Sequence, residues 1–178
     1  MRPEDRQVAF DAFTRRMEEG GSDLSCSNPN VVGYCLRKAV HESEVGSAEE
    51  ALIYWDSLRA FLPQENAPTQ MPWVLSQVLI YMNAGEKESA IETARAAVKR
   101  AAPEGCGGYG GVHPCQMLAR ALAHFGEHDE AIDLLEKMLP APSWLTVNLL
   151  KIDPVWDPLR DHPRFQALLE KYADDVEH

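Results

Sequence analysis

The sequence predicts an all-α protein built from repeated helical hairpins. Alanine, glutamate and leucine dominate the composition and β-branched runs are scarce, which favours helix over strand. A glycine followed five residues later by an alanine recurs at Gly46, Gly85 and Gly126, at spacings of 39 and 41 residues. Self-similarity at a period of about 20–50 residues is typical of helical repeat proteins.

The stretch 117–139 shows the unit most clearly, as two short amphipathic helices with a tight turn between them. Gly126 ends the first helix, because glycine adopts the left-handed conformation that closes a helix without strain. Small residues such as Ala119 and Ala131 let two antiparallel helices approach closely. The second helix of each unit has an apolar face at i, i+4 and i+7 spacing. These faces are Ala51, Trp55 and Leu58; Ala90, Ala94 and Ala97; and Ala131, Leu135 and Met138.

These hairpins resemble the tetratricopeptide repeat (TPR) family, which has small residues at the helix crossing, a glycine in the turn and a proline near the end, here Pro63. The family period is about 34 residues. The additional residues of each longer unit in this chain fall in the connectors 63–71 and 102–114. The resemblance implies a right-handed α-α superhelix. Its units are expected at about 30–63, 69–102 and 112–142 of one domain spanning 1–178.

The individual helices follow from local signals. A capping helix is expected over 3–19, because Pro3 suits a first helical turn and the glycines at 20–21 end it. The polar loop 22–30 comes next. The repeat helices are then expected over 30–44, 47–61, 71–84, 87–101, 113–125 and 128–139.

The C-terminal part, 143–174, breaks the period and is expected to cap the array. Its apolar run over 144–152 must find cover, and a last helix begins near Pro163. The segment 150–172 resembles a tail found at the end of bacterial TPR regions. Such regions often follow a kinase, cyclase or winged-helix domain, and this chain contains none of these.

Charge and hydropathy narrow the class of partner. The formal net charge of -11 argues against nucleic-acid phosphate and favours a basic partner. There is no run of 18 apolar residues, so no membrane span is expected. The N-terminus lacks the apolar core of a signal peptide, so we expect a cytoplasmic protein. Oxidised cysteines would instead indicate the periplasm or secretion.

No motif indicates catalysis or a bound cofactor, so we expect a protein that is not an enzyme. The stretch 105–110 matches G-x-G-x-x-G, but a dinucleotide site needs that turn between a strand and a helix. The chain has no P-loop, no G-x-S-x-G elbow and no H-E-x-x-H pair.

The resemblance implies a scaffold that binds a protein or peptide of unknown identity in a concave groove, which the first helices of the units line. The groove has an apolar wall, Leu75, Leu79 and Met82, which suits docking of a partner. The polar residues beside this wall, Asn83, Gln116 and Arg120, can hydrogen-bond a peptide. The alternative is that the C-terminal run over 144–152 folds back and fills the groove. Carried over residue by residue, the groove is formed by Leu75, Leu79, Met82, Asn83, Gln116, Arg120 and His124.

The four cysteines form two pairs with equal spacing. Eight residues separate Cys26 from Cys35, and eight separate Cys106 from Cys115. Three interpretations remain open: free buried thiols, two disulfides that each pin a connector to a helix, and a metal site at Cys106, His113 and Cys115. The metal spacing matches no standard zinc pattern. The second and third would support an alternative function as a redox- or metal-responsive regulatory module.

Overall fold

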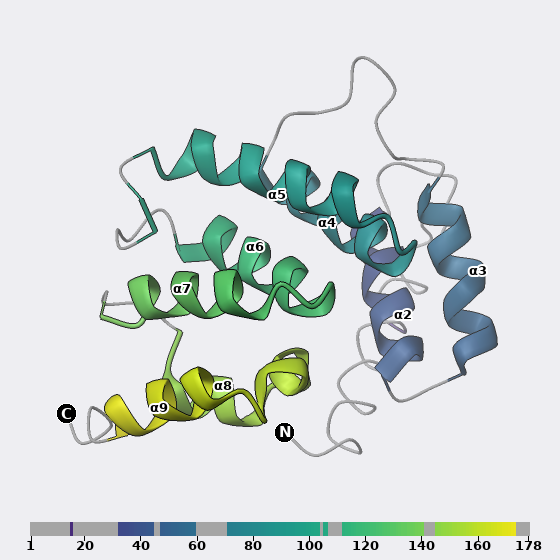
Figure 1. The fold of residues 1–178 in the computed structure, drawn as a ribbon. Coiled ribbons are helices and arrows are strands. Elements are labelled where there is room, and N and C mark those ends of the chain that lie inside the picture. Colours follow the sequence, from purple (N-terminus) through teal and green to yellow (C-terminus); the bar gives the residue numbers. More distant parts are fainter. Residues whose placement is uncertain are drawn as a thin grey trace. The chain divides into compact units, whose positions relative to one another are not determined.

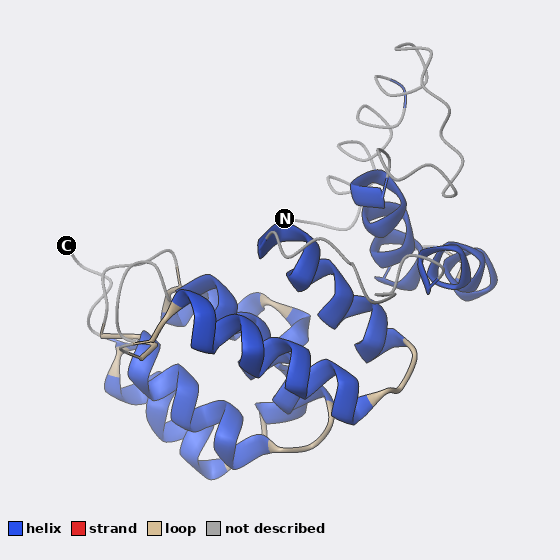
Figure 2. Ribbon diagram, turned by 90° about the horizontal axis from the view of Figure 1, so that it is seen from above, coloured by secondary structure: helices blue, strands red, loops and turns tan. Residues whose placement is uncertain are grey.

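All regular secondary structure in the described part of the chain is helical (Figures 1 and 2). No strand occurs among the described residues, so the all-α prediction is confirmed for them. No helix among them is long and apolar enough to cross a bilayer. The predicted helix over 3–19 lies outside the description apart from one residue. The computed structural model describes Arg15 and residues 32–44, 47–59, 71–103, 105–106, 112–140 and 145–173.

The chain divides into two compact units, 1–67 and 68–178. The prediction of a single array over 1–178 is not tested by this division and stays a prediction.

In the first unit, α2 (Val32–Glu44) packs against α3 (Ala48–Arg59). The indole N–H of Trp55 donates to the Ser43 hydroxyl over 3.0 Å and links the two helices. Lys38 and Glu42 occupy places where the repeat pattern has apolar residues, and they lie 3.9 Å apart as an i, i+4 ion pair. The apolar face predicted for α3 is buried: Ala51, Trp55 and Leu58.

The second unit contains two successive helical hairpins, α4–α5 and α6–α7. Helix α6 contacts both helices of the preceding hairpin, so the hairpins pack side by side (Figure 1). The predicted helix boundaries are confirmed to within two residues in both units. The four helices are α4 (Met71–Asn83), α5 (Lys87–Ala101), α6 (Val112–His124) and α7 (His128–Met138).

Both hairpin turns depend on a glycine in the left-handed conformation. Gly85 has a φ of 72° and Gly126 a φ of 82°. At the second turn, the N–H of Glu127 donates to the Leu122 carbonyl over 2.9 Å and that of Gly126 to the Ala123 carbonyl over 3.3 Å. This is the Schellman arrangement, which satisfies carbonyls that a helix end leaves unpaired. The predicted role of Gly85 and Gly126 as turn glycines is confirmed, and Gly46 lies outside the described residues.

The helices of the second unit meet through small buried residues. Ala94 on α5, Ala119 on α6 and Ala131 on α7 have no solvent exposure. A methyl side chain at a crossing lets two helix backbones approach closely, and the larger residues around it fill the remaining core. The i, i+4, i+7 faces predicted for α5 and α7 are buried throughout: Ala90, Ala94 and Ala97; and Ala131, Leu135 and Met138.

The C-terminal segment completes this core. It consists of α8 (Val147–Ile152), the 3-10 helix η2 (Pro154–Leu159) and α9 (Pro163–Lys171). The η2 segment packs on α6, and α9 packs on α7 and α8. Trp156 and Phe165 are fully buried in the same cluster as the repeat helices.

An exposed arginine joins α9 to α7. Arg164 contacts Asp129 over 2.8 Å and Asp133 over 2.6 Å. These contacts lower the pKa of Asp129 below its ordinary value and raise that of Arg164. Because all three groups are exposed, the ion pairs add little stability, and the apolar contacts of α9 dominate its attachment.

Replacing Ala131 with leucine tests the packing directly. The extra methylenes have no room at a fully buried crossing, so the free energy of unfolding should fall by about 1–3 kcal/mol. Denaturant unfolding measures this change. The matched control is Lys137→Leu at an exposed position of the same helix. Equal midpoints for the two variants would contradict the helix register.

Candidate functional site

The second-unit part of the predicted groove belongs to α4. Met82 is 8% exposed and forms part of the core cluster of this unit, and half-buried Leu79 packs against the same cluster. Asn83 is exposed at the end of the helix. Leu75 lies on α4, and its side chain is outside the description. The two described apolar residues of this wall therefore contribute to the protein's own packing.

The third-unit part of the predicted groove belongs to α6. Gln116 is only 2% exposed. Arg120 is half-buried and its guanidinium donates to the Asp153 carboxylate over 2.8 Å. His124 is exposed, with its ring edge-on to Phe125 at a centroid distance of 4.8 Å. Of the three, only His124 presents its side chain freely to solvent.

The C-terminal segment covers the face of α6 that carries Arg120. The Asp153 carboxylate, which binds Arg120, also accepts a hydrogen bond from the backbone N–H of Val155 over 3.1 Å. This hydrogen bond caps the start of η2 on this face. The alternative placed the run 144–152 over the apolar residues of the groove on α4, and that placement stays a prediction. The covering residues are those of 153–159, next to the run 144–152 that the sequence indicated.

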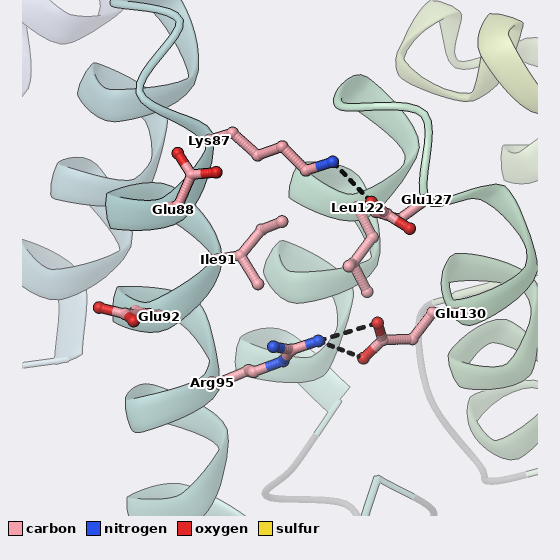
Figure 3. Close-up of a pocket in the computed structure, with 8 residues that line it drawn as sticks. All are labelled: Lys87, Glu88, Ile91, Glu92, Arg95, Leu122, Glu127 and Glu130. Carbon is pink, nitrogen blue, oxygen red and sulfur yellow. Dashed lines mark hydrogen bonds and ion pairs between the residues drawn. The ribbon is translucent and has the colours of Figure 1, made fainter.

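A pocket on another face of the second unit offers an open site. It has a volume of about 310 Å³ and lies between α5 and the hairpin α6–α7 (Figure 3). Buried Ile91 and Leu122 form its apolar floor. The charged residues that line it are Lys87, Glu88, Glu92, Arg95, Glu127 and Glu130.

Two ion pairs span this pocket from one hairpin to the other. The Lys87 ammonium donates to the Glu127 carboxylate, and one guanidinium nitrogen of Arg95 lies 2.8 Å from each carboxylate oxygen of Glu130. In Figure 3 both cations reach across from α5, and the floor lies between the two bridges. Lys87 lowers the pKa of Glu127 below its ordinary value, mainly through this hydrogen bond. The Glu127 carboxylate is therefore ionised at neutral pH.

Two further carboxylates line the same pocket. Glu88 and Glu92 stand on the α5 side of the pocket, and neither has an ion-pair partner in the part of the chain that the structure describes. They are four residues apart on one helix, so their like charges repel each other mildly. The lining as a whole is negative, with four carboxylates against two cations.

This pocket could not be recognised in the sequence, because its charged residues have the pattern of ordinary solvated helix surface. Its bridges join residues 40 and 35 positions apart, and no local pattern connects such residues. The only available signal was the repeat register, which places α5 beside the next hairpin.

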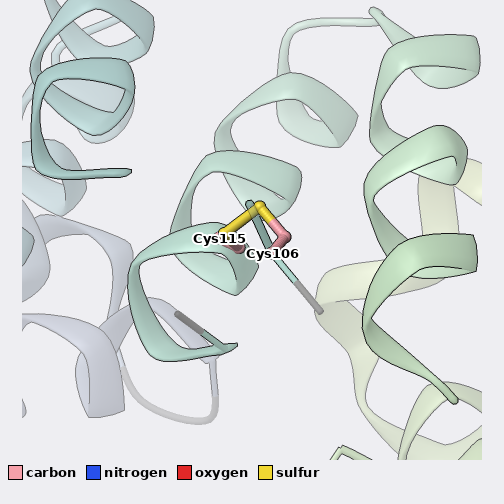
Figure 4. Close-up of a disulfide and its surroundings, with 2 residues drawn as sticks. All are labelled: Cys106 and Cys115. Atoms are coloured by element: carbon pink, nitrogen blue, oxygen red, sulfur yellow. A yellow bond between two sulfur atoms is a disulfide. The ribbon is translucent and has the colours of Figure 1, made fainter. Parts of the chain in front are cut away.

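The second cysteine pair is joined in the structure. Cys106 and Cys115 form a disulfide that ties the connector after α5 to the start of α6 (Figure 4). Both residues are buried in the core cluster. Burial shields the bond from soluble reductants, which favours a structural role over a redox switch. Cys35 is also disulfide-bonded. Its expected partner Cys26 lies outside the described residues, so that pairing stays a prediction.

The disulfide removes two of the three ligands considered for a metal. Cys106 and Cys115 have no thiolate to offer while they are bonded to each other, and His113 is exposed. Within the described ranges, no group of three histidine, cysteine or acidic residues is arranged to hold a metal ion.

Comparisons with family models, with curated proteins and with solved structures find no match to this chain. The resemblance to tetratricopeptide repeats therefore rests on the residues of the chain itself.

Replacing Leu79 with glutamate tests whether this position is structural. A charge placed against the core cluster should lower the free energy of unfolding by about 1–3 kcal/mol, measured by thermal or denaturant unfolding. Asn83→Glu adds the same charge at an exposed position one turn further along α4 and should have little effect. A folded Leu79→Glu protein with unchanged stability would show that the wall is open.

Removing the Cys106–Cys115 bond by a double replacement with alanine should cost about 2–3 kcal/mol of stability, because the bond closes a short loop in the unfolded chain. Urea unfolding without reductant measures the loss. Peptide mapping of the unaltered protein should recover the two cysteines in one linked peptide. Free thiols at both positions in protein purified without reductant would contradict the bond.

Proposed function

We propose that the chain is a TPR-like helical-repeat scaffold that binds a protein or peptide partner, with no catalytic step and no cofactor. The observation that carries this proposal is the pocket between α5 and the hairpin α6–α7, which has an apolar floor and a charged rim. Interfaces between proteins commonly combine an apolar centre with a polar rim in this way.

Three features support the repeat assignment. The hairpins α4–α5 and α6–α7 pack side by side through α6. Both turns use a left-handed glycine, at Gly85 and Gly126. The buried alanines Ala90 and Ala131 stand at the same register position after those glycines. A stack of similar hairpins exposes a surface that extends over several units, and this favours binding of an extended partner.

The position of the C-terminal segment decides which face we assign to the partner. The face of α6 that carries Arg120 is occupied by 153–159 of the same chain. Exposed ion pairs bridge the pocket face, and such pairs cost little to rearrange when a partner binds. We therefore place the partner at the pocket and not in the groove that the family resemblance implied.

The disulfide bears on the cellular compartment of the protein. Disulfides form and persist in oxidising compartments and are rare in the cytosol. The Cys106–Cys115 bond therefore favours the periplasm or secretion over the cytoplasmic location that the N-terminal sequence suggested.

Site-directed photocrosslinking tests the proposed face. A photoreactive amino acid at Ala96, an exposed position beside Arg95, should capture a discrete partner in extracts of the source cell. This position leaves every lining residue of the pocket in place.

The same photoreactive group at Glu170, exposed on α9, provides the control. The proposal expects a crosslinked species from position 96 that position 170 does not give. Identical products from both positions, or none from either, would contradict it.

A further inference from the structure

The pocket on α5 has the charge and shape to bind one particular kind of side chain. We propose that it receives an arginine side chain from a basic segment of the partner protein, an inference that rests on the proposed function. The aliphatic stem would lie over the floor of Ile91 and Leu122, and the guanidinium would lie at the α5 rim beside Glu88. The exposed Glu92 side chain, which points away from the floor in Figure 3, would rotate toward it.

The balance of charge in the pocket favours a cation. Lys87 and Arg95 are each engaged with a carboxylate across the pocket, at Glu127 and Glu130. After these pairings two negative charges remain in the lining, and the chain as a whole carries a net charge of -11. A negative cleft in a negative molecule attracts basic partners and repels acidic ones.

The spacing of the two unpaired carboxylates favours a guanidinium over an ammonium. Glu88 and Glu92 are one helical turn apart, which places their Cβ atoms about 5–6 Å from each other. A guanidinium presents five donors in a planar fork and can donate to two carboxylates, whereas an ammonium is a compact point charge. A cation between these groups would also relieve the repulsion between their like charges.

The floor and the volume suit the rest of an arginine side chain. Ile91 and Leu122 present an apolar surface between the two bridges, where a three-carbon stem can pack while its charged head remains at the rim. A volume of about 310 Å³ lies at the lower end of the range for small-molecule sites, and it is large enough for one side chain. A single anchoring residue in such a pocket is typical of the centre of an interface.

A short fluorescein-labelled peptide of alternating arginine and serine provides the probe, and its binding to the full chain is followed by fluorescence anisotropy. The double variant Glu88→Gln with Glu92→Gln should weaken binding about tenfold, as expected for loss of charged hydrogen bonds. The control Glu49→Gln with Glu50→Gln removes the same charge from exposed positions on α3 and should leave affinity nearly unchanged. Circular dichroism should show equal helix content in all three proteins.

Two further peptides sharpen the test. Replacing every arginine of the probe with lysine should weaken binding, and replacing every arginine with glutamate should abolish it. Equal losses in the pocket variant and the α3 control would show a general charge effect and overturn the site. A lysine peptide that binds as tightly as the arginine peptide would overturn the assignment to arginine.

Failure of the arginine pocket can be distinguished from failure of the proposed scaffold function. A partner that crosslinks through position 96 and still binds the Glu88→Gln, Glu92→Gln protein with full affinity would leave the scaffold function standing and refute the arginine pocket.

Discussion

The close approach of neighbouring helices through buried alanines is the constraint on which the second unit depends. Ala94, Ala119 and Ala131 have no exposed surface, and each lies on a different helix of adjacent hairpins. Methyl side chains bring the helix axes together, so that Leu122, Leu135 and the other large residues can fill one continuous core. The same closeness brings α5 near enough to the next hairpin for side chains to span the gap as ion pairs. The pocket is therefore a consequence of the helix packing.

The C-terminal segment changes what the hairpins can do. An array of two hairpins leaves the last one with an uncovered apolar face, and terminal repeats in such arrays need a cap. Here the cap buries Trp156 and Phe165 and also crosses the face of α6 that a simple repeat would offer to a ligand. The cover has a cost, because the side-chain nitrogen of Gln116 and the indole nitrogen of Trp156 are buried without a hydrogen-bond partner among the described residues. Apolar burial offsets that cost.

Local signals in the sequence predicted the described helices well, because turn glycines and i, i+4, i+7 spacing act over a few residues. The pairing of Cys106 with Cys115 was one of three interpretations that the spacing left open. The site could not be predicted in the same way. The register placed Arg120 on the correct helix, but its contact with Asp153 joins residues 33 positions apart. The repeat register also does not determine how exposed a side chain is. Ile91 and Ile132 are buried, whereas Leu52 at the equivalent position of the first unit is 61% exposed.

In the proposed function, the C-terminal segment closes the α6 face and leaves the pocket on α5 as the binding surface. A double-mutant cycle on Arg120→Ala and Asp153→Ala tests the closure most directly, because the cycle cancels the separate role of Asp153 in beginning η2. Denaturant unfolding of the four proteins should give a coupling energy of about 1 kcal/mol, since both side chains are half-buried and in direct contact. Strictly additive effects would mean that the segment does not lie on α6, and the account of the open and closed faces would fail.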